Sequence, residues 1–330
     1  MRLRKALLAL GFAPLLAGAA LAKQATSERP FTVAKDAPAP APLAARPAPP
    51  LVRNISPDNS YGPHKVAFAN GVSGAFDLAY TVLPGFRPLT LDLYSPASTL
   101  RPVPAIVFVH GGGWNGGDAR HAGTFEDFPA QLAALAARGY VVASVNYRLS
   151  EEAHFPGPLQ DVKAAIRWLR AHAGEHNIDI TRVAVWGAAA GGQLAALAGV
   201  TCGVDRFEPV ADAGAKDLPS DCVQAVIDWY GVSDLQSLAQ DNGKPDASRQ
   251  SFSAEPTSAE GNYLGCEPAD CAPALARLAS PLAFISATAP AFLIQHGAQD
   301  TTVPPKQSQK LYDALRLCVV KTIGTVEGVV

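Results

Sequence analysis

Hydrophobic and polar residues begin to follow the periods of regular secondary structure at about residue 65. Apolar and polar side chains alternate over 76–81 and 89–94, which is typical of strands with one solvent-facing side. We therefore predict two strands at an antiparallel edge of a sheet. Continuous apolar runs over 105–109 and 140–145 instead indicate strands that are covered on both faces.

Helix and strand patterns then alternate along the chain. Apolar residues recur at helical spacing over 128–137, 162–173 and 306–315. Further strands are predicted at 183–186, 223–229, 291–295 and 319–326. This alternation predicts the α/β class, with a mostly parallel sheet and helices on both of its faces.

A long segment between Ser233 and Pro290 interrupts this alternation. It is rich in Ser, Ala, Pro and Asp and is too long for a plain connection between two elements. We therefore expect a cap or lid, inserted at about 233–290 into one α/β domain that covers 65–330.

The first 64 residues are predicted to lie outside that domain. Basic residues precede an apolar run over 6–21, and small residues at 20 and 22 fit a cleavage site, so we predict a signal peptide over 1–22. A transmembrane anchor is the alternative, but the run is short and is interrupted by Gly and Pro. Residues 23–64 are predicted to form a Pro/Ala-rich, extended tether.

Composition and charge narrow the possible partners. A hydrophobic share of 48% and a charged share of 17% are typical of a globular protein. The formal net charge is −2 and no basic stripe is present, so we expect no nucleic-acid partner. After cleavage of the signal peptide we expect no stable membrane insertion. The mature chain is predicted to be secreted or periplasmic, where disulfides persist.

Five cysteines lie in the second half of the chain. We predict that Cys202 pairs with Cys222 and that Cys266 pairs with Cys271, which leaves Cys318 unpaired. Zinc binding is the alternative, but no Cys-x-x-Cys motif or Cys/His cluster supports it. We expect no metal and no cofactor.

The stretch from Val183 to Gly192 is the most informative in the chain. A short apolar strand is followed by Gly187-Ala188-Ala189-Ala190-Gly191-Gly192, and helical spacing resumes after it. This is the shape of a nucleophile elbow, in which a G-x-S-x-G turn exposes one side chain between a strand and a helix. The tip here is Ala189, which has no oxygen with which to attack a substrate, and no G-x-S-x-G occurs elsewhere.

A run of glycines, His110-Gly111-Gly112-Gly113-Trp114, directly follows the first buried strand. Consecutive glycines allow backbone N–H groups to converge on a ligand, as an oxyanion hole requires. Glycines at 111, 113 and 116 also satisfy the dinucleotide fingerprint G-x-G-x-x-G. That interpretation requires an acidic residue near the end of the next strand, and the sequence there, up to Arg148, has none.

Taken in chain order, these motifs resemble those of α/β-hydrolase-fold carboxylesterases. The resemblance is to the H-G-G-G or H-G-G-x-W branch, which includes hormone-sensitive-lipase-like and feruloyl- or acetyl-esterase-like proteins. The motifs that carry it are His110–Trp114, Asn146–Leu149, Pro156 with Asp161, Gly187–Gly192, and His296-Gly297-x-x-Asp300-x-x-Val303-Pro304. It runs from about Lys65 to the C-terminus and implies the α/β-hydrolase fold.

The resemblance also implies a role for individual residues. Ala189 occupies the nucleophile position, where the family has Ser. The backbone N–H groups of Gly112, Gly113 and Ala190 would form the oxyanion hole, and Asp300 matches the acid that orients the catalytic His. No histidine follows His296, so we expect the C-terminus to be cut short before the family's general base.

Without a nucleophile and a base, acyl transfer by the Ser-His-Asp route is blocked. We therefore expect an exported carboxylic-ester hydrolase in a form that binds a small-molecule ester and does not turn it over. One alternative is a natural pseudo-esterase that acts as a binding protein. Another is an amide hydrolase of the aryl-formamidase type.

Overall fold

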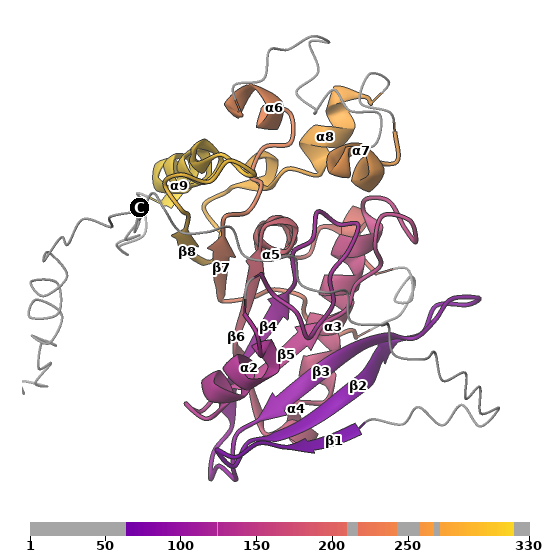
Figure 1. Cartoon of the computed structure of the whole chain (residues 1–330), viewed down its shortest axis with the longest axis vertical. Helices are drawn as coiled ribbons and strands as arrows, with labels where there is room; N and C mark the ends of the chain where they lie inside the picture. Colours follow the sequence, from indigo (N-terminus) through magenta and orange to yellow (C-terminus); the bar gives the residue numbers. More distant parts are fainter. Residues whose placement is uncertain (1–63, 124, 210–216, 243–257, 267–270, 320–330) are drawn as a thin grey trace, which may run out of the picture. The chain divides into compact units, whose positions relative to one another are not determined.

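The computed structural model describes residues 64–123, 125–209, 217–242, 258–266 and 271–319 (Figure 1). The predicted signal peptide over 1–22 and nearly all of the predicted tether over 23–64 lie outside these residues. The described residues all belong to one unit, which starts at Asp58. None of the described helices is long and apolar enough to cross a membrane.

An eight-stranded sheet forms the centre of the described residues, in the order β1-β2-β3-β5-β4-β6-β7-β8. The strands are β1 His64–Ala67, β2 Ser73–Thr81, β3 Leu89–Ser95, β4 Val103–Val109, β5 Val141–Val145, β6 Ile178–Ala188, β7 Ala225–Trp229 and β8 Ala291–Gln295. β1, β2 and β3 pair antiparallel with their neighbours, whereas β5, β4, β6, β7 and β8 are parallel to one another. The predicted mostly parallel sheet with an antiparallel edge is confirmed.

Helices connect the strands much as the apolar spacing predicts. They are α2 Phe128–Ala136, α3 Gly157–Ala171, α4 Ala173–His176, α5 Ala190–Val200, α6 Leu238–Asp241, α7 Ala259–Leu264, α8 Pro273–Leu278 and α9 Pro305–Val319. The helix predicted from 162 begins five residues earlier, since Pro158 in its first turn needs no backbone N–H partner there. α9 includes Val319, where we predicted a strand to begin, and the remainder of that strand, 320–326, lies outside the described residues.

The helices pack against both faces of the sheet. α3 and α5 share a core with inward side chains of the parallel strands, including Val107, Val185 and Val226. α2 packs on the opposite face against Phe108 and Trp186. This alternation along each strand explains the continuous apolar runs, because successive side chains enter different cores.

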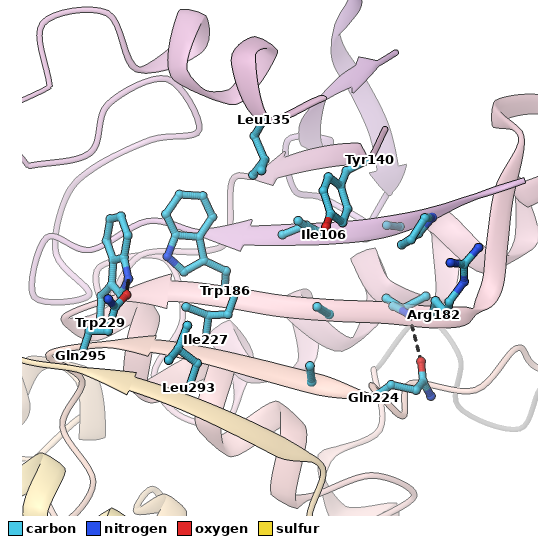
Figure 2. A pocket seen from close by; sticks show the side chains of 15 residues that line it. Ile106, Leu135, Tyr140, Arg182, Trp186, Gln224, Ile227, Trp229, Leu293 and Gln295 are labelled. Atoms are coloured by element: carbon cyan, nitrogen blue, oxygen red, sulfur yellow. Dashed lines mark hydrogen bonds between the residues drawn. The ribbon is translucent and has the colours of Figure 1, made fainter. Parts of the chain in front are cut away.

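α2 covers only part of its face. An apolar groove of about 540 Å³ crosses β4, β6, β7 and β8 beyond it, with Ile106, Trp186, Ile227 and Leu293 among its lining residues (Figure 2). Leu293 is 39% exposed there. Such exposure is unusual for a parallel strand, whose faces are ordinarily both covered.

Part of the predicted insertion is helical. α6, α7, α8 and a short 3₁₀ helix at Pro281–Phe284 lie within 233–290, whereas 243–257 and 267–270 lie outside the described residues. Figure 1 shows α6, α7 and α8 gathered beyond the carboxyl ends of β7 and β8. The assignment of this segment as a cap remains a prediction.

Both predicted disulfides are present. Cys202 is bonded to Cys222 and Cys266 to Cys271, and Cys318 is a free thiol.

Candidate active site

The turn between β6 and α5 has the backbone conformation of a sharp elbow. Ala189 lies at its tip with φ 52° and ψ −117°, in a region that non-glycine residues rarely adopt. Two hydrogen bonds hold it there. The Ala189 N–H donates to the carbonyl of Trp229 over 2.9 Å, and the Ala189 carbonyl accepts from the N–H of Gln193 over 3.0 Å. A strained residue of this kind persists only where its surroundings determine it.

The glycines that flank the tip allow very close backbone contact. A Cβ on Gly191 would lie 2.0 Å from the carbonyl oxygen of Val109, and a Cβ on Gly187 would lie 2.0 Å from that of Gly191. Any larger residue at either position would collide with backbone. The small-residue pattern of the sequence is therefore a steric requirement of the elbow.

The glycine loop after β4 lies beside the elbow. A Cβ on Gly111 would be 2.8 Å from the carbonyl oxygen of Ala188 and 3.4 Å from the Cβ of Ala189. Gly112 and Gly113 follow with φ values of 110° and 61°, which glycine adopts readily. The backbone predicted to form an oxyanion hole thus begins close beside the residue at the nucleophile position.

The acid predicted at Asp300 follows the end of β8. Strand register pairs Val109 with Gly187, Ala188 with Trp229, and Trp229 with Gln295. Because these strands are parallel, the segments after β4, β6 and β8 all leave from the same edge of the sheet. The carboxyl edge of a parallel sheet is where ligands bind in open α/β folds.

Comparison with known proteins identifies the family. Residues 91–315 match the BD-FAE family model. The chain belongs to the BD-FAE family.

Two curated relatives of this BD-FAE chain come from Mycobacterium tuberculosis. Esterase LipC is 31% identical over 227 residues, which is 69% of this chain and 52% of LipC. Probable carboxylic ester hydrolase LipM is 33% identical over 234 residues, 70% of this chain and 48% of LipM. The chain therefore spans about half the length of these relatives.

Solved structures agree with the family. A bifunctional GH43-CE protein of Bacteroides eggerthii has a TM-score of 0.63 and 30% identity, over 74% of this chain and 33% of that one. A truncated carbohydrate esterase from gut microbiota has a TM-score of 0.61 and 28% identity, over 78% of this chain and 87% of that one. The predicted α/β-hydrolase fold and the resemblance to esterases are confirmed.

Among the residues that the structure describes, His296 is the one histidine close to Asp300. Its Nε2 lies 3.5 Å from the Asp300 Oδ2. Nε2 also lies 2.8 Å from the carbonyl oxygen of Val303, and Nδ1 lies 2.7 Å from the hydroxyl of Ser308. A carbonyl only accepts, so Nε2 carries a proton, and Nδ1 is occupied by its hydrogen bond with the Ser308 hydroxyl. His296 therefore has no free lone pair with which to act as a base.

Asp300 itself makes the contacts of a turn-capping residue. Its Oδ1 accepts the N–H groups of Thr302 over 2.8 Å and of Val303 over 3.0 Å. Burial raises the pKa of Tyr230, the residue that follows β7, and the negative charge of Asp300 raises it further. Its role as the acid of a triad remains a prediction.

His110 supports the glycine loop. Its side chain is buried, and its Nδ1 lies 2.7 Å from the carbonyl oxygen of Gly111. The ring stacks on Tyr147 at 4.3 Å, and the Tyr147 hydroxyl donates to the His110 carbonyl over 3.0 Å. Burial lowers the pKa of His110, so the ring is neutral and shapes the loop.

Asp228, which lies behind the elbow in β7, does not stand out in the sequence as a site residue. Its side chain is buried, and burial raises its pKa to about 7. Its Oδ1 accepts the N–H of Gly231 over 2.9 Å. The available signal was an acidic residue inside an otherwise apolar strand.

One group of three potential metal ligands occurs among the described residues, formed by Cys202, Asp221 and Cys222. The two sulfurs are bonded to each other, and the Asp221 carboxylate pairs with the buried amine of Lys163. With its ligand atoms committed in this way, the group does not fit a metal ion.

Proposed function

We propose that this BD-FAE chain is an exported protein that binds a carboxylic ester beside Ala189 and does not turn it over. The observation that supports this proposal most directly is the elbow at Ala189. Its tip has φ 52° and lies beside the glycine loop, but its side chain is only a methyl group. A hydrolase that acts through this elbow requires an oxygen or sulfur nucleophile at the tip.

In this proposal the backbone binds the ester carbonyl. The N–H groups of Gly112, Gly113 and Ala190 point toward the carbonyl oxygen, and Asp300 occupies the position of the family's acid. Preorganised donors of this kind still bind an ester when the nucleophile is missing. Names of the relatives support an ester as the ligand, since LipC is called an esterase and LipM a probable carboxylic ester hydrolase.

Two features support the absence of turnover. Residue 189 is Ala, and both nitrogens of His296 are occupied by Val303 and Ser308. Losing the nucleophile or the base costs on the order of 10⁶ in turnover in a well-studied protease, and losing both costs about the same. Export is supported by the two disulfides, which persist in oxidising compartments.

Binding and turnover can be tested with methyl ferulate. We expect the chain to bind this ester saturably, as followed by quenching of tryptophan fluorescence, and to release no ferulate. Ala189→Leu should weaken binding because it places a branched side chain at the tip, whereas Ala134→Leu on the exposed side of α2 should not. Absence of saturable binding would refute the proposal, and release of ferulate by the chain would refute the inactive state.

The class of bond can be tested with Ala189→Ser. Because the described residues offer this serine no free base, we expect slow acylation by p-nitrophenyl acetate, the most activated of three substrates. Methyl ferulate and an aryl formamide should react more slowly still. Faster cleavage of the formamide than of either ester would favour an amide hydrolase.

A further inference from the structure

The side chain of Gln193 connects three separate parts of the site. It is fully buried in the first turns of α5, four residues beyond Ala189. Its Oε1 accepts the indole N–H of Trp114 over 3.0 Å. Its Nε2 donates to the carbonyl of Ala279 over 2.6 Å and to the hydroxyl of Tyr263 over 3.3 Å.

Trp114 is the residue at which the glycine loop ends. It has a left-handed φ of 58°, and its carbonyl accepts the N–H and the hydroxyl of Ser150 over 2.8 and 3.1 Å. Its indole stacks on the ring of Tyr263, with centroids 4.6 Å apart and planes 11° from parallel. Contacts to its backbone, its ring face and its indole N–H therefore restrict the movement of Trp114. Because Gly113 directly precedes Trp114 in the chain, the same contacts restrict Gly113.

The insertion also contacts the loop from the other side. A Cβ on Gly113 would lie 3.3 Å from the Cβ of Ala259, the first residue of α7. α7 further supplies Tyr263, whose carbonyl accepts the N–H of Phe155 over 2.7 Å. The glycine loop therefore lies between the elbow helix and α7, and Gln193, on the elbow helix, bonds both to Trp114 at the end of the loop and to Tyr263 of α7.

We propose that Gln193 is a positioning residue for the oxyanion hole. By holding Trp114, it fixes the N–H groups of Gly112 and Gly113 relative to the elbow tip. This inference rests on the proposed function, because it assumes that those groups face the ester oxygen. Oxyanion donors act through preorganisation, so a small displacement weakens their interaction with a charged oxygen more than with a neutral one.

Two conservative substitutions test the bond between these side chains. Gln193→Met keeps most of the volume and removes every hydrogen bond, whereas Trp114→Phe keeps an aromatic ring on Tyr263 and removes only the indole N–H. The probes are 4-nitrophenyl methylphosphonate, a tetrahedral anion, and methyl ferulate, a neutral ester. We expect each substitution to weaken phosphonate binding about tenfold or more and to change ester binding less than about threefold. The double variant should lose little more than either single variant, because both break the same bond.

Gln307→Met is the matched control. Gln307 is also fully buried, accepts the N–H groups of Ser233 and Asp234, and donates to Asp241, away from the glycine loop. We expect a comparable fall in thermal stability and an unchanged ratio of phosphonate to ester affinity. If Gln193→Met leaves this ratio at the parent value, or if Gln307→Met lowers it equally, Gln193 does not position the loop. If the parent binds neither probe, the proposed function fails and this inference fails with it.

Discussion

Asp228 lies directly behind Gly192, with its Oδ1 2.5 Å from where a Cβ of that glycine would be. The same oxygen is 2.3 Å from the equivalent point on Gly231 and accepts its N–H over 2.9 Å. The buried Asp228 carboxyl group thus packs between the backbone of Gly192, at the start of α5, and that of Gly231, which follows β7. Burial favours its protonated form and raises its pKa to about 7.

This pKa predicts how stability depends on pH. The folded state binds the proton more tightly than the unfolded state, whose carboxyl has the ordinary pKa of 3.8. The stabilisation is fully present below about pH 4 and is lost as pH rises to about 7. Asp228→Asn cannot ionise and still offers an oxygen to Gly231. It should match the parent at pH 4 and be more stable by a few kcal/mol at pH 8, at about 1.4 kcal/mol per unit of pKa shift.

Urea unfolding at pH 4, 6 and 8 measures this effect. Asp313→Asn, on the exposed side of α9, is the control and should leave the pH dependence of the parent unchanged. Parallel stability curves for Asp228→Asn and the parent would show that the carboxyl is ionised in the fold.

Strain at the elbow predicts an unusual response to glycine. Ala189 has a positive φ, which costs an L-residue about 1–2 kcal/mol and costs glycine little. Relief of this strain should offset the entropic cost of glycine, so Ala189→Gly should be at least as stable as the parent. Ala134→Gly, exposed within α2, should lose about 1 kcal/mol. Thermal unfolding compares the two, and equal losses would argue against strain at residue 189.

Two glycines near the elbow, Gly191 and Gly116, should differ strongly in their tolerance of alanine. A Cβ on Gly191 would lie 2.0 Å from the carbonyl oxygen of Val109 and 2.4 Å from that of His110, both of them backbone atoms. A Cβ on Gly116 would meet nothing within 4 Å. We therefore expect Gly191→Ala to lower the free energy of unfolding by several kcal/mol, or to prevent folding, and Gly116→Ala to change it by less than about 0.5 kcal/mol. Soluble yield and urea midpoints distinguish them, and a well-tolerated Gly191→Ala would mean that α5 can shift away from β4.

Periodicity predicted the sheet well because its strands carry clear patterns. The run at 291–295 coincides with β8, and the alternation at 89–94 lies within β3. β6 extends back to Ile178 through exposed polar residues such as Thr181, which hides its beginning from a hydrophobicity pattern. Helix ends were less accurate, since α9 continues to Val319 over side chains that read equally well as strand.

The backbone geometry around Ala189 was predictable where glycines recur in short motifs. Glycine spacing identified the elbow and the loop, because only glycine tolerates the contacts at Gly187 and Gly191. Gln193 was not identified, since its partners lie far away in the sequence, and Asp228 was not identified, since its burial behind Gly192 arises only in the fold. Gln193, for example, bonds to Trp114 and to Tyr263 at separations of 79 and 70 residues. Contacts of that kind exist only once the chain has folded.

The two disulfides should differ in what they contribute to stability. Cys202–Cys222 links residues 20 apart, whereas Cys266–Cys271 links residues 5 apart. A cross-link stabilises mainly by restricting the unfolded chain, and the effect grows with loop length. Replacing Cys202 and Cys222 together by Ser should cost about 3 kcal/mol, against about 2 kcal/mol for the other pair.

The longer disulfide also lies next to a buried ion pair, which should enlarge this difference. Asp221, adjacent to Cys222, pairs with the fully buried Lys163, whose amine also donates over 2.6 Å to the carbonyl of Thr201, adjacent to Cys202. If the backbone relaxes when the cross-link is removed, the buried Lys163 amine is separated from Asp221 and Thr201, and the loss should exceed the chain-entropy value because an unpaired buried charge is costly. Urea unfolding of both double variants provides the comparison. Equal losses would contradict both the effect of loop length and the contribution of the Lys163 ion pair.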